Sequence, residues 1–270
     1  NSKKIFCATS TNGHFLNDEN CKKTIESGLK RLIISIDGNN QETYEVYRKN
    51  GRFEKVIEGT KNILRWKKKL NSKCVIGFQM VVTKENMNDI VPLSKLGKEC
   101  GVDYFVVKPC SDTFDNRLDS PKGEYIEALD IFKEAEQYSN ENYTVNVKWK
   151  KVLNGGWKDY NSCHGTQFIL GLSGRGDVFP CGHWFQERRD EFLMGNIIEK
   201  SFKEIWESDR YWEVQEKIRK EVNVNKHCES NCRQHYINRF LFHEGKTNME
   251  KIKKDYKKHI DRKPDHINFI

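Results

Sequence analysis

Apolar runs alternate with amphipathic segments over the first half of the chain. The amphipathic segments are clearest from about Phe53 to Leu70 and from about Met87 to Cys100, and an earlier one begins after Asn17. The apolar runs are KKIFCATST at 3–11, LIISID at 32–37, CVIGFQMVVT at 74–83 and YFVVKP at 104–109. Strands that alternate with helices indicate βαβ units and a parallel sheet. We therefore predict an α/β fold with four parallel strands, either as an open sheet or as part of a barrel.

The pattern changes in the second half. Residues 110–160 are mostly polar, with a helix expected from Glu124 to Tyr138. After Cys163, the segments FILGLS and DVFPC on either side of the turn GRG predict a β-hairpin. Helices are expected at 201–208 and near 210–220. We divide the chain into the strand–helix unit at 1–120, a bridging segment at 121–160, a small α+β domain at 161–245 and a basic helical tail at 246–270.

Polar residues stand at or just after the ends of the predicted strands. They are Thr11, Asn12, Asp37, Thr83 and Lys108. Ser35 shares a strand face with Asp37, and Gln79 shares one with Thr83. Ligands of parallel α/β folds bind at this edge of the sheet. Each residue alone is equally well explained as a turn residue, but their convergence on one edge favours a binding site.

Composition narrows the classes of partner. The 270 residues carry a net charge of +8 that is spread along the chain, and the basic run RWKKK at 65–69 is typical of a solvated helix face. A positive balance favours an anionic substrate or cofactor, and we expect no nucleic-acid partner. The sequence has no apolar stretch that could span a bilayer and no signal-peptide core at its start. Nine cysteines in a chain of this length do not suggest a secreted disulfide framework, so we expect a cytoplasmic protein with metal-binding thiols.

Four cysteines of the last third carry the strongest chemical signal. Cys163 and Cys181 flank the hairpin glycine Gly176, and Cys228 and Cys232 follow, so the two pairs enclose 17 and three residues. Four thiolates complete a [4Fe–4S] site or a tetrahedral zinc site. Zinc ribbons favour two intervening residues in both pairs, but the spacing alone leaves both metals open.

Several motifs stand in a distinctive order. They are TNG at 11–13, ISIDG at 34–38, YRKNGRFEKV at 47–56, FQMVVTKEN at 78–86, VVKP at 106–109, C-x12-G-x4-C at 163–181, MGNIIEKSFKEIW at 194–206 and CESNCRQHYIN at 228–238. In these motifs the chain resembles radical S-adenosylmethionine enzymes that carry a C-terminal SPASM or twitch domain. The resemblance implies a partial (βα)6 barrel, here its third to sixth strands, followed by a small α+β iron–sulfur domain. It also implies that Cys163, Cys181, Cys228 and Cys232 bind one auxiliary [4Fe–4S] cluster. Because all four ligands would be thiolates, electron transfer is favoured over binding of substrate to iron.

The resemblance also implies residues that bind S-adenosylmethionine. Ser35 matches the serine near the cofactor, and Arg48 matches the arginine that pairs with its carboxylate, a role suited to a planar guanidinium. Gln79 and Asn86 match positions that line the pocket. The ordinary alternative for Arg48 is a charge on a helix surface, and the catalytic residues are unknown.

The family's CxxxCxxC motif, which binds the catalytic [4Fe–4S] cluster, is absent from these 270 residues, and so is its glycine-rich GGEP-like strand. We expect both upstream of Asn1, and we expect this segment alone to be inactive. The resemblance implies an enzyme that uses a 5′-deoxyadenosyl radical to oxidise, dehydrogenate or epimerise a sugar or small alcohol. A ferredoxin or flavodoxin is the expected electron donor, and no membrane partner is expected. The alternatives are a peptide-modifying maturase and a non-catalytic iron–sulfur or zinc-binding protein.

Overall fold

The computed structural model describes residues 6–112, 117–121, 123–186 and 188–244. The chain divides into two compact units. Unit 1 comprises Asn1–Cys110 and Ser120–Gly155, and unit 2 comprises Ser111–Asp119 and Gly156–Ile270. The tail predicted as helical at 246–270 lies outside the described residues. None of the helices in the described part of the chain is long and apolar enough to cross a membrane.

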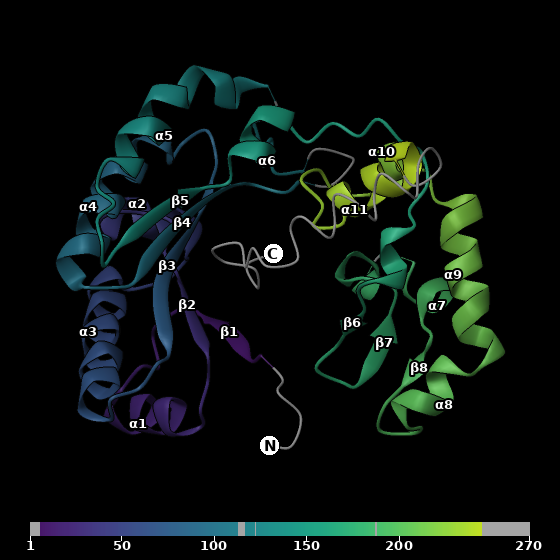
Figure 1. The fold of residues 1–270 in the computed structure, drawn as a ribbon, viewed down its shortest axis with the longest axis horizontal. Helices are drawn as coiled ribbons and strands as arrows, with labels where there is room; N and C mark the ends of the chain where they lie inside the picture. The colour runs from purple at the N-terminus through teal and green to yellow at the C-terminus, as the bar shows by residue number, and fades with distance from the viewer. Residues whose placement is uncertain (1–5, 113–116, 122, 187, 245–270) are drawn as a thin grey trace. The chain divides into compact units, whose positions relative to one another are not determined.

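Unit 1 is built on a parallel sheet of five strands whose order in space follows the sequence, β1-β2-β3-β4-β5 (Figure 1). The strands are β1 (Ala8–Thr11), β2 (Arg31–Ser35), β3 (Val75–Val82), β4 (Tyr104–Pro109) and β5 (Thr144–Val147). The connecting helices are α1 (Asp18–Glu26), α2 (Gln41–Tyr47), α3 (Phe53–Lys69), α4 (Ile90–Cys100), α5 (Leu129–Glu136) and α6 (Trp149–Asn154). The predicted α/β class with a parallel sheet is confirmed.

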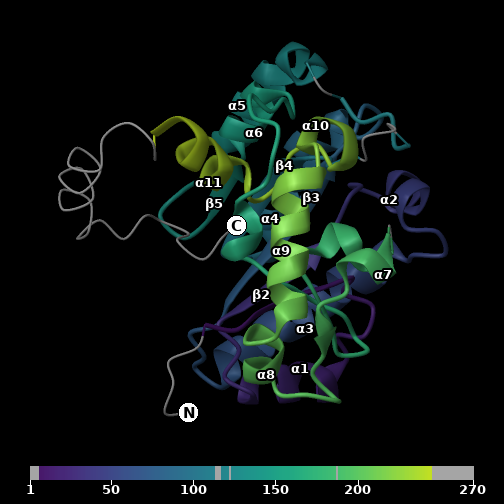
Figure 2. The ribbon, with the colours of Figure 1, turned by 90° about the vertical axis from the view of Figure 1, so that its right-hand side faces the viewer.

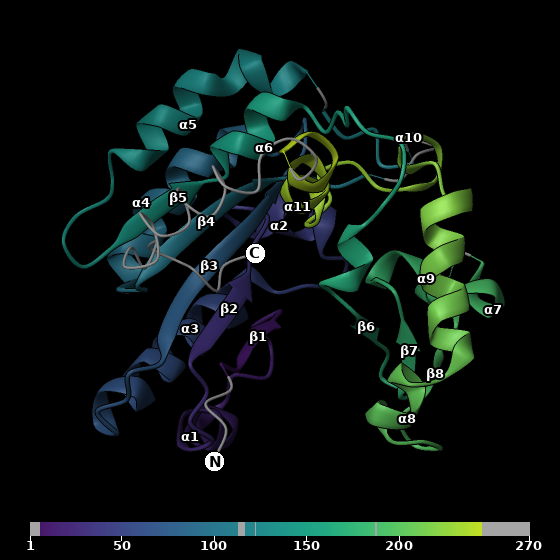
Figure 3. The ribbon, with the colours of Figure 1, turned by 45° about the vertical axis from the view of Figure 1, so that its right-hand side comes forward.

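Helices α3, α4 and α5 lie along one face of this sheet (Figures 1 and 3). The buried positions of α3 include Val56, Ile63 and Trp66, which recur at helical spacing and form the apolar stripe that the sequence pattern predicts. On β3, Phe78 and Met80 are fully buried. The alternate positions of the strands therefore point to the other face, and this face carries the polar residues described below.

Close packing in the sheet requires one glycine. A Cβ atom on Gly77 would lie 2.4 Å from the ring of Tyr104, its register partner on β4. Tyr104 is 1% exposed, so its ring is enclosed by protein. Gly77 thus makes room for a buried aromatic side chain between two neighbouring strands.

The sequence prediction omits β5 and treats residues 121–160 as a bridge. In the structure β5 pairs with β4 through Val147 and Val107, and residues 120–155 pack with the sheet in unit 1. A helix was expected over 124–138, and its place is taken by a 3-10 turn at Glu124–Ala128 followed by α5. The strand TVNV is short and half polar, which explains why its pattern is weak.

Unit 2 contains a small antiparallel sheet of three strands, β6 (Gly171–Leu172), β7 (Asp177–Phe179) and β8 (Gly195–Asn196). Its helices are α7 (Arg189–Phe192), α8 (Phe202–Trp206), α9 (Asp209–Glu221), α10 (Val224–His227) and α11 (His235–Arg239). Figure 2 shows α9 running from α8 to α10. Val214 and Ile218 of α9 join Phe179, Trp184 and Phe192 in a buried core. The predicted hairpin and both predicted helices are confirmed.

Candidate functional site

The first candidate site lies at the C-terminal ends of β2 and β3 in unit 1. Ser35 and Gln79 are register partners there, and both are half-buried. The same row continues through Val106 on β4 to Asn146 on β5. Their neighbours along the strands, such as Ile34 and Phe78, are completely buried. Two of the predicted cofactor residues thus stand side by side on the less buried face of the sheet.

Asp37 organises this edge. Its carboxylate is 7% exposed and accepts two hydrogen bonds from Arg48 on Oδ2, from Nε at 2.9 Å and from Nη2 at 2.5 Å. Its other oxygen, Oδ1, accepts a hydrogen bond from the backbone N–H of Val81 at 2.9 Å. Asp37 therefore joins the end of β2 to the end of β3 and fixes the guanidinium of Arg48 at this edge.

Arg48 directly follows α2, and its side chain is 36% exposed. The two bonds to Asp37 use two of the five N–H donors of the guanidinium. Three donors are left for an anionic ligand such as a carboxylate. The guanidinium is thus oriented by a buried carboxylate and still reaches the surface. Arg48 is therefore not a freely solvated charge on a helix surface, which was the alternative interpretation.

Asn86 has a different environment. It is 1% exposed, its Nδ2 donates to the carbonyl oxygens of Asp37 and Val81, and its Oδ1 accepts from Thr83 N at 2.8 Å. The amide thus braces the chain after β3 and is almost entirely enclosed by protein. Of the remaining strand-end residues, Thr11 and Asn12 accept hydrogen bonds from the backbone N–H groups of Gly13 and His14, as turn residues do.

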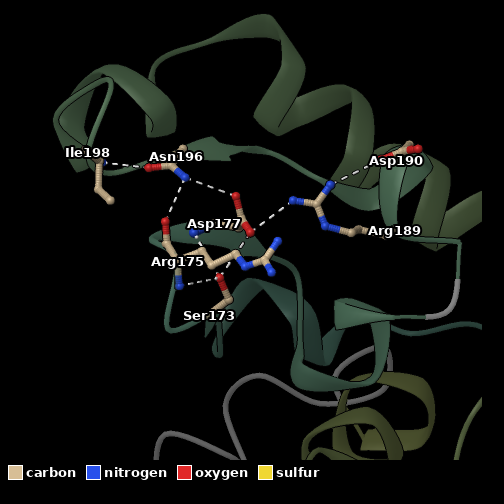
Figure 4. A network of polar contacts seen from close by, with 7 residues as sticks. All are labelled: Ser173, Arg175, Asp177, Arg189, Asp190, Asn196 and Ile198. Carbon is tan, nitrogen blue, oxygen red and sulfur yellow. Dashed lines mark hydrogen bonds and ion pairs between the residues drawn. The ribbon is translucent and has the colours of Figure 1, made fainter.

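The second candidate site is built on the hairpin of unit 2. Asp177 at the start of β7 lies at the centre of a network of polar contacts (Figure 4). It binds Arg189 Nη2 at 3.0 Å, Asn196 Nδ2 at 3.0 Å and Ser173 Oγ at 3.1 Å. The bond from Arg189 is the largest of the effects that hold the pKa of Asp177 below its ordinary value. Gly176 has φ +83° in the turn, a conformation that favours glycine, so the network and the turn together fix the hairpin.

The four predicted cysteine ligands lie around this hairpin and around α10 and α11. Cys163 precedes the 3-10 turn Gly165–Gln167, and Cys181 precedes the 3-10 turn Gly182–Phe185. Cys228 directly follows α10, and Cys232 accepts a hydrogen bond onto its carbonyl oxygen from His235 N in α11. All four are partly exposed.

The thiols share one electrostatic environment. Burial raises the pKa of Cys181 to about 12, with further raising effects from Cys232 and Cys163. Burial also raises the pKa of Cys228, and the charges of the other three thiols add to this rise. Cys163, Cys181 and Cys228 also pack against the same buried core of unit 2. Within the described residues, no three His, Cys, Asp or Glu side chains are grouped as for a single metal ion.

Hydrogen-bond donors point at two of these sulfurs. The backbone N–H of Gln234 donates to Cys232 Sγ, and the side chain of Asn238 donates to Cys163 Sγ, both at 3.4 Å. Lys158 is close enough for the thiols to raise its pKa against the larger lowering effect of burial. Four cysteine thiols, two of which accept N–H donors, beside a lysine provide the donor set of an iron–sulfur cluster, so the residues fit that group. Neither Asn238 nor Lys158 is predicted as a site residue from the sequence, and only the motif that ends at position 238 contains a signal for Asn238.

Comparisons with known proteins bear on the fold of the chain and on the class of its C-terminal domain. Residues 163–234 match the SPASM family, described as an iron–sulfur cluster-binding domain. The chain is 30% identical over 242 residues to an AdoMet-dependent heme synthase of Methanosarcina barkeri. The alignment covers 81% of this chain and 64% of that protein. It is 23% identical over 218 residues to a tungsten-containing aldehyde ferredoxin oxidoreductase cofactor-modifying protein of Pyrococcus furiosus, covering 75% of this chain and 59% of that protein.

Two solved structures share the fold. Streptococcus suis SuiB bound to S-adenosylmethionine superimposes with a TM-score of 0.59 at 16% identity, over 87% of this chain and 57% of that one. The structure of anSMEcpe with bound AdoMet has a TM-score of 0.56 at 19% identity, over 78% of this chain and 59% of that one. The chain thus spans less than two thirds of the length of these relatives.

Together, the parallel sheet and the cysteine-bearing unit define the class. Residues 163–234 form a SPASM iron–sulfur cluster-binding domain, and the chain is a relative of radical S-adenosylmethionine enzymes. The resemblance read from the sequence motifs is confirmed.

Proposed function

We propose that Cys163, Cys181, Cys228 and Cys232 hold one auxiliary [4Fe–4S] cluster in a radical S-adenosylmethionine enzyme. The observation that carries this proposal is geometric: Cys163, Cys181 and Cys228 pack against one buried core, and N–H groups of unit 2 donate to the sulfurs of Cys163 and Cys232. The match of residues 163–234 to an iron–sulfur domain supports it independently. Four protein thiolates would leave no open iron position, so a cluster held here would be suited to electron transfer.

The edge formed by Ser35, Gln79, Asp37 and Arg48 is the proposed cofactor site. The guanidinium of Arg48, held by Asp37, would bind the carboxylate of S-adenosylmethionine. Ser35 and Gln79 lie on the adjoining strand face and would line the pocket. Bound beside the catalytic [4Fe–4S] cluster of a complete enzyme, S-adenosylmethionine would supply radical hydrogen-abstraction chemistry, with a ferredoxin or flavodoxin as the source of the reducing electron. A cytoplasmic location remains a prediction.

The substrate class has two candidates. The sequence motifs favour the oxidation, dehydrogenation or epimerisation of a sugar or small alcohol. The solved structures favour a peptide, because SuiB is bound to precursor peptide SuiA in one structure and anSMEcpe to the Cp18Cys peptide in another. Incubation of the complete enzyme with each substrate class, followed by detection of 5′-deoxyadenosine and of the mass change in the substrate, decides between them.

Anaerobic reconstitution of the full chain tests the cluster. Wild type should bind about four irons and about four sulfides and show broad absorption in the visible range. Cys163→Ser and Cys228→Ser should lose this cluster, while Cys100→Ser in α4 of unit 1 should keep it. A colourless chain that holds one zinc ion and no sulfide would reject the iron–sulfur assignment and favour the zinc-binding alternative.

A further inference from the structure

Asn238 connects α11 to the first cluster cysteine across 75 positions of sequence. Its side chain is 1% exposed. Nδ2 donates to Cys163 Sγ at 3.4 Å, while Oδ1 accepts from the backbone N–H groups of His164 at 2.7 Å and Gly165 at 2.9 Å. All three bonds go to the cysteine itself or to the two residues after it.

These bonds also determine which way the amide faces. Two backbone N–H groups can only donate, so the oxygen of Asn238 must be the atom that faces them. The NH₂ group is consequently on the side of the Cys163 sulfur. The orientation of the donor toward the sulfur therefore follows from the neighbouring backbone.

The packing keeps this contact short. A Cβ atom on Gly165 would lie 2.4 Å from Cβ of Gln234 and 3.2 Å from Nδ2 of Asn238. Residue 165 must be a glycine for α11 to approach the chain after Cys163 so closely. The helix turn from Gln234 to Asn238 is itself closed by the bond from Asn238 N to Gln234 O at 2.9 Å.

An N–H donor onto a cluster thiolate withdraws negative charge from the sulfur and favours the reduced, more negative cluster. Of the two N–H···S bonds described above, that of Gln234 comes from the backbone and that of Asn238 from a side chain. We propose that Asn238 is a positioning residue that fixes Cys163 and raises the reduction potential of the auxiliary cluster. This inference rests on the proposed cluster ligands.

The test uses the full chain, reconstituted anaerobically, with the midpoint potential followed by electron paramagnetic resonance. Asn238→Asp keeps the oxygen acceptor and the shape, but it replaces the donor with an anionic oxygen. Its midpoint should shift to a more negative potential than wild type. Asn238→Ser, which is neutral and too short to reach the sulfur, should shift in the same direction by less. Gln215→Glu is the matched control, because Gln215 is a buried amide of the same unit that donates to Thr166 O and to the Tyr211 hydroxyl.

The outcomes separate the two proposals. A wild-type chain that takes up no cluster contradicts the proposed function. A wild-type chain with a cluster, together with an Asn238→Asp variant at the wild-type midpoint, overturns the role of Asn238. If Asn238→Asp does not load, Asn238→Ser takes its place, and an unchanged midpoint there overturns the inference as well.

Discussion

At the scale of single residues, the edge proposed as the cofactor site is organised by one buried carboxylate. Asp37 is buried and uses both oxygens, one for Arg48 and one for Val81 N. The sequence motifs identify Arg48, but the partner that orients it is visible only in the folded chain. The same is true of Asn86, whose motif predicts a pocket residue and whose buried amide braces the backbone. A motif identifies candidate site residues. The hydrogen bonds of the folded chain show which residues hold those candidates in position.

Arg48→Lys tests this edge. Lysine keeps the charge but has no planar fork, so it cannot bind Asp37 through two nitrogens and present further donors in a fixed orientation. In the complete protein that carries this chain, affinity for S-adenosylmethionine should fall about tenfold, which corresponds to about 1.4 kcal/mol. Isothermal titration calorimetry measures it. Arg52→Lys, an exposed arginine four residues further on, should bind as wild type does, and equal affinity in both variants would remove Arg48 from the site.

At the scale of elements, helices and strands with a strong apolar period are predicted well from the sequence. The helix α3 begins at Phe53 and ends at Lys69, close to the expected range. The strand β5 is missed because TVNV alternates with polar residues and lies in a segment that is polar overall. Its place in the sheet depends on pairing with β4, a long-range contact that local periodicity does not report.

Packing between β3 and β4 can be tested with Gly77→Ala. The added methyl group would overlap the buried ring of Tyr104, and a shift of either strand would strain the hydrogen bonds between β3 and β4. We expect the free energy of unfolding to fall by about 2–3 kcal/mol in urea denaturation. Gly123→Ala is the control, because a Cβ atom there has no neighbour within 4 Å and the backbone is not in the left-handed region. A Gly77→Ala variant as stable as Gly123→Ala would show that the strands adjust freely.

The link between α7 and α9 should depend on pH. Hydrogen bonds from Arg188 and Lys217 lower the pKa of Glu191 from its ordinary 4.5 to about 2. Because the folded pKa is the lower one, the stabilisation is complete above about pH 5 and is lost as the pH falls toward 2. Glu191→Gln should therefore have a lower urea midpoint than wild type at pH 7, and this gap should close near pH 2.

Glu134→Gln, at an exposed position of α5, should stay close to wild type at both pH values. Since Glu191 is partly exposed, its gap at pH 7 should also narrow in 1 M salt. A gap that persists at pH 2 would mean that the substitution acts through packing and not through charge.

At the scale of the whole molecule, cluster loading should act on one unit. Metal binding is coupled to folding, because the folded chain must hold the deprotonated ligands together. A bound cluster therefore stabilises the unit that binds it. Hydrogen exchange measured with and without the cluster should show slower exchange in α9 and α11 of the loaded chain. The amides of β3 and β4 in unit 1 should exchange at similar rates in both states. Equal protection of both units would contradict a cluster confined to unit 2.

The path of the chain between the two units has a consequence for synthesis and for dissection. Residues 111–119 leave the sheet to join unit 2, where Asp112 exchanges hydrogen bonds with Ser230, and the chain then returns to unit 1 until residue 155. During synthesis, the segment 111–119 would leave the ribosome long before Ser230, the partner of Asp112. It would therefore have no partner in unit 2 while β5 completes the sheet of unit 1. No single cut separates the two units, since cleavage after residue 155 leaves Ser230 without Asp112. A C-terminal fragment that is to fold as unit 2 must therefore carry 111–119 as a second, grafted piece.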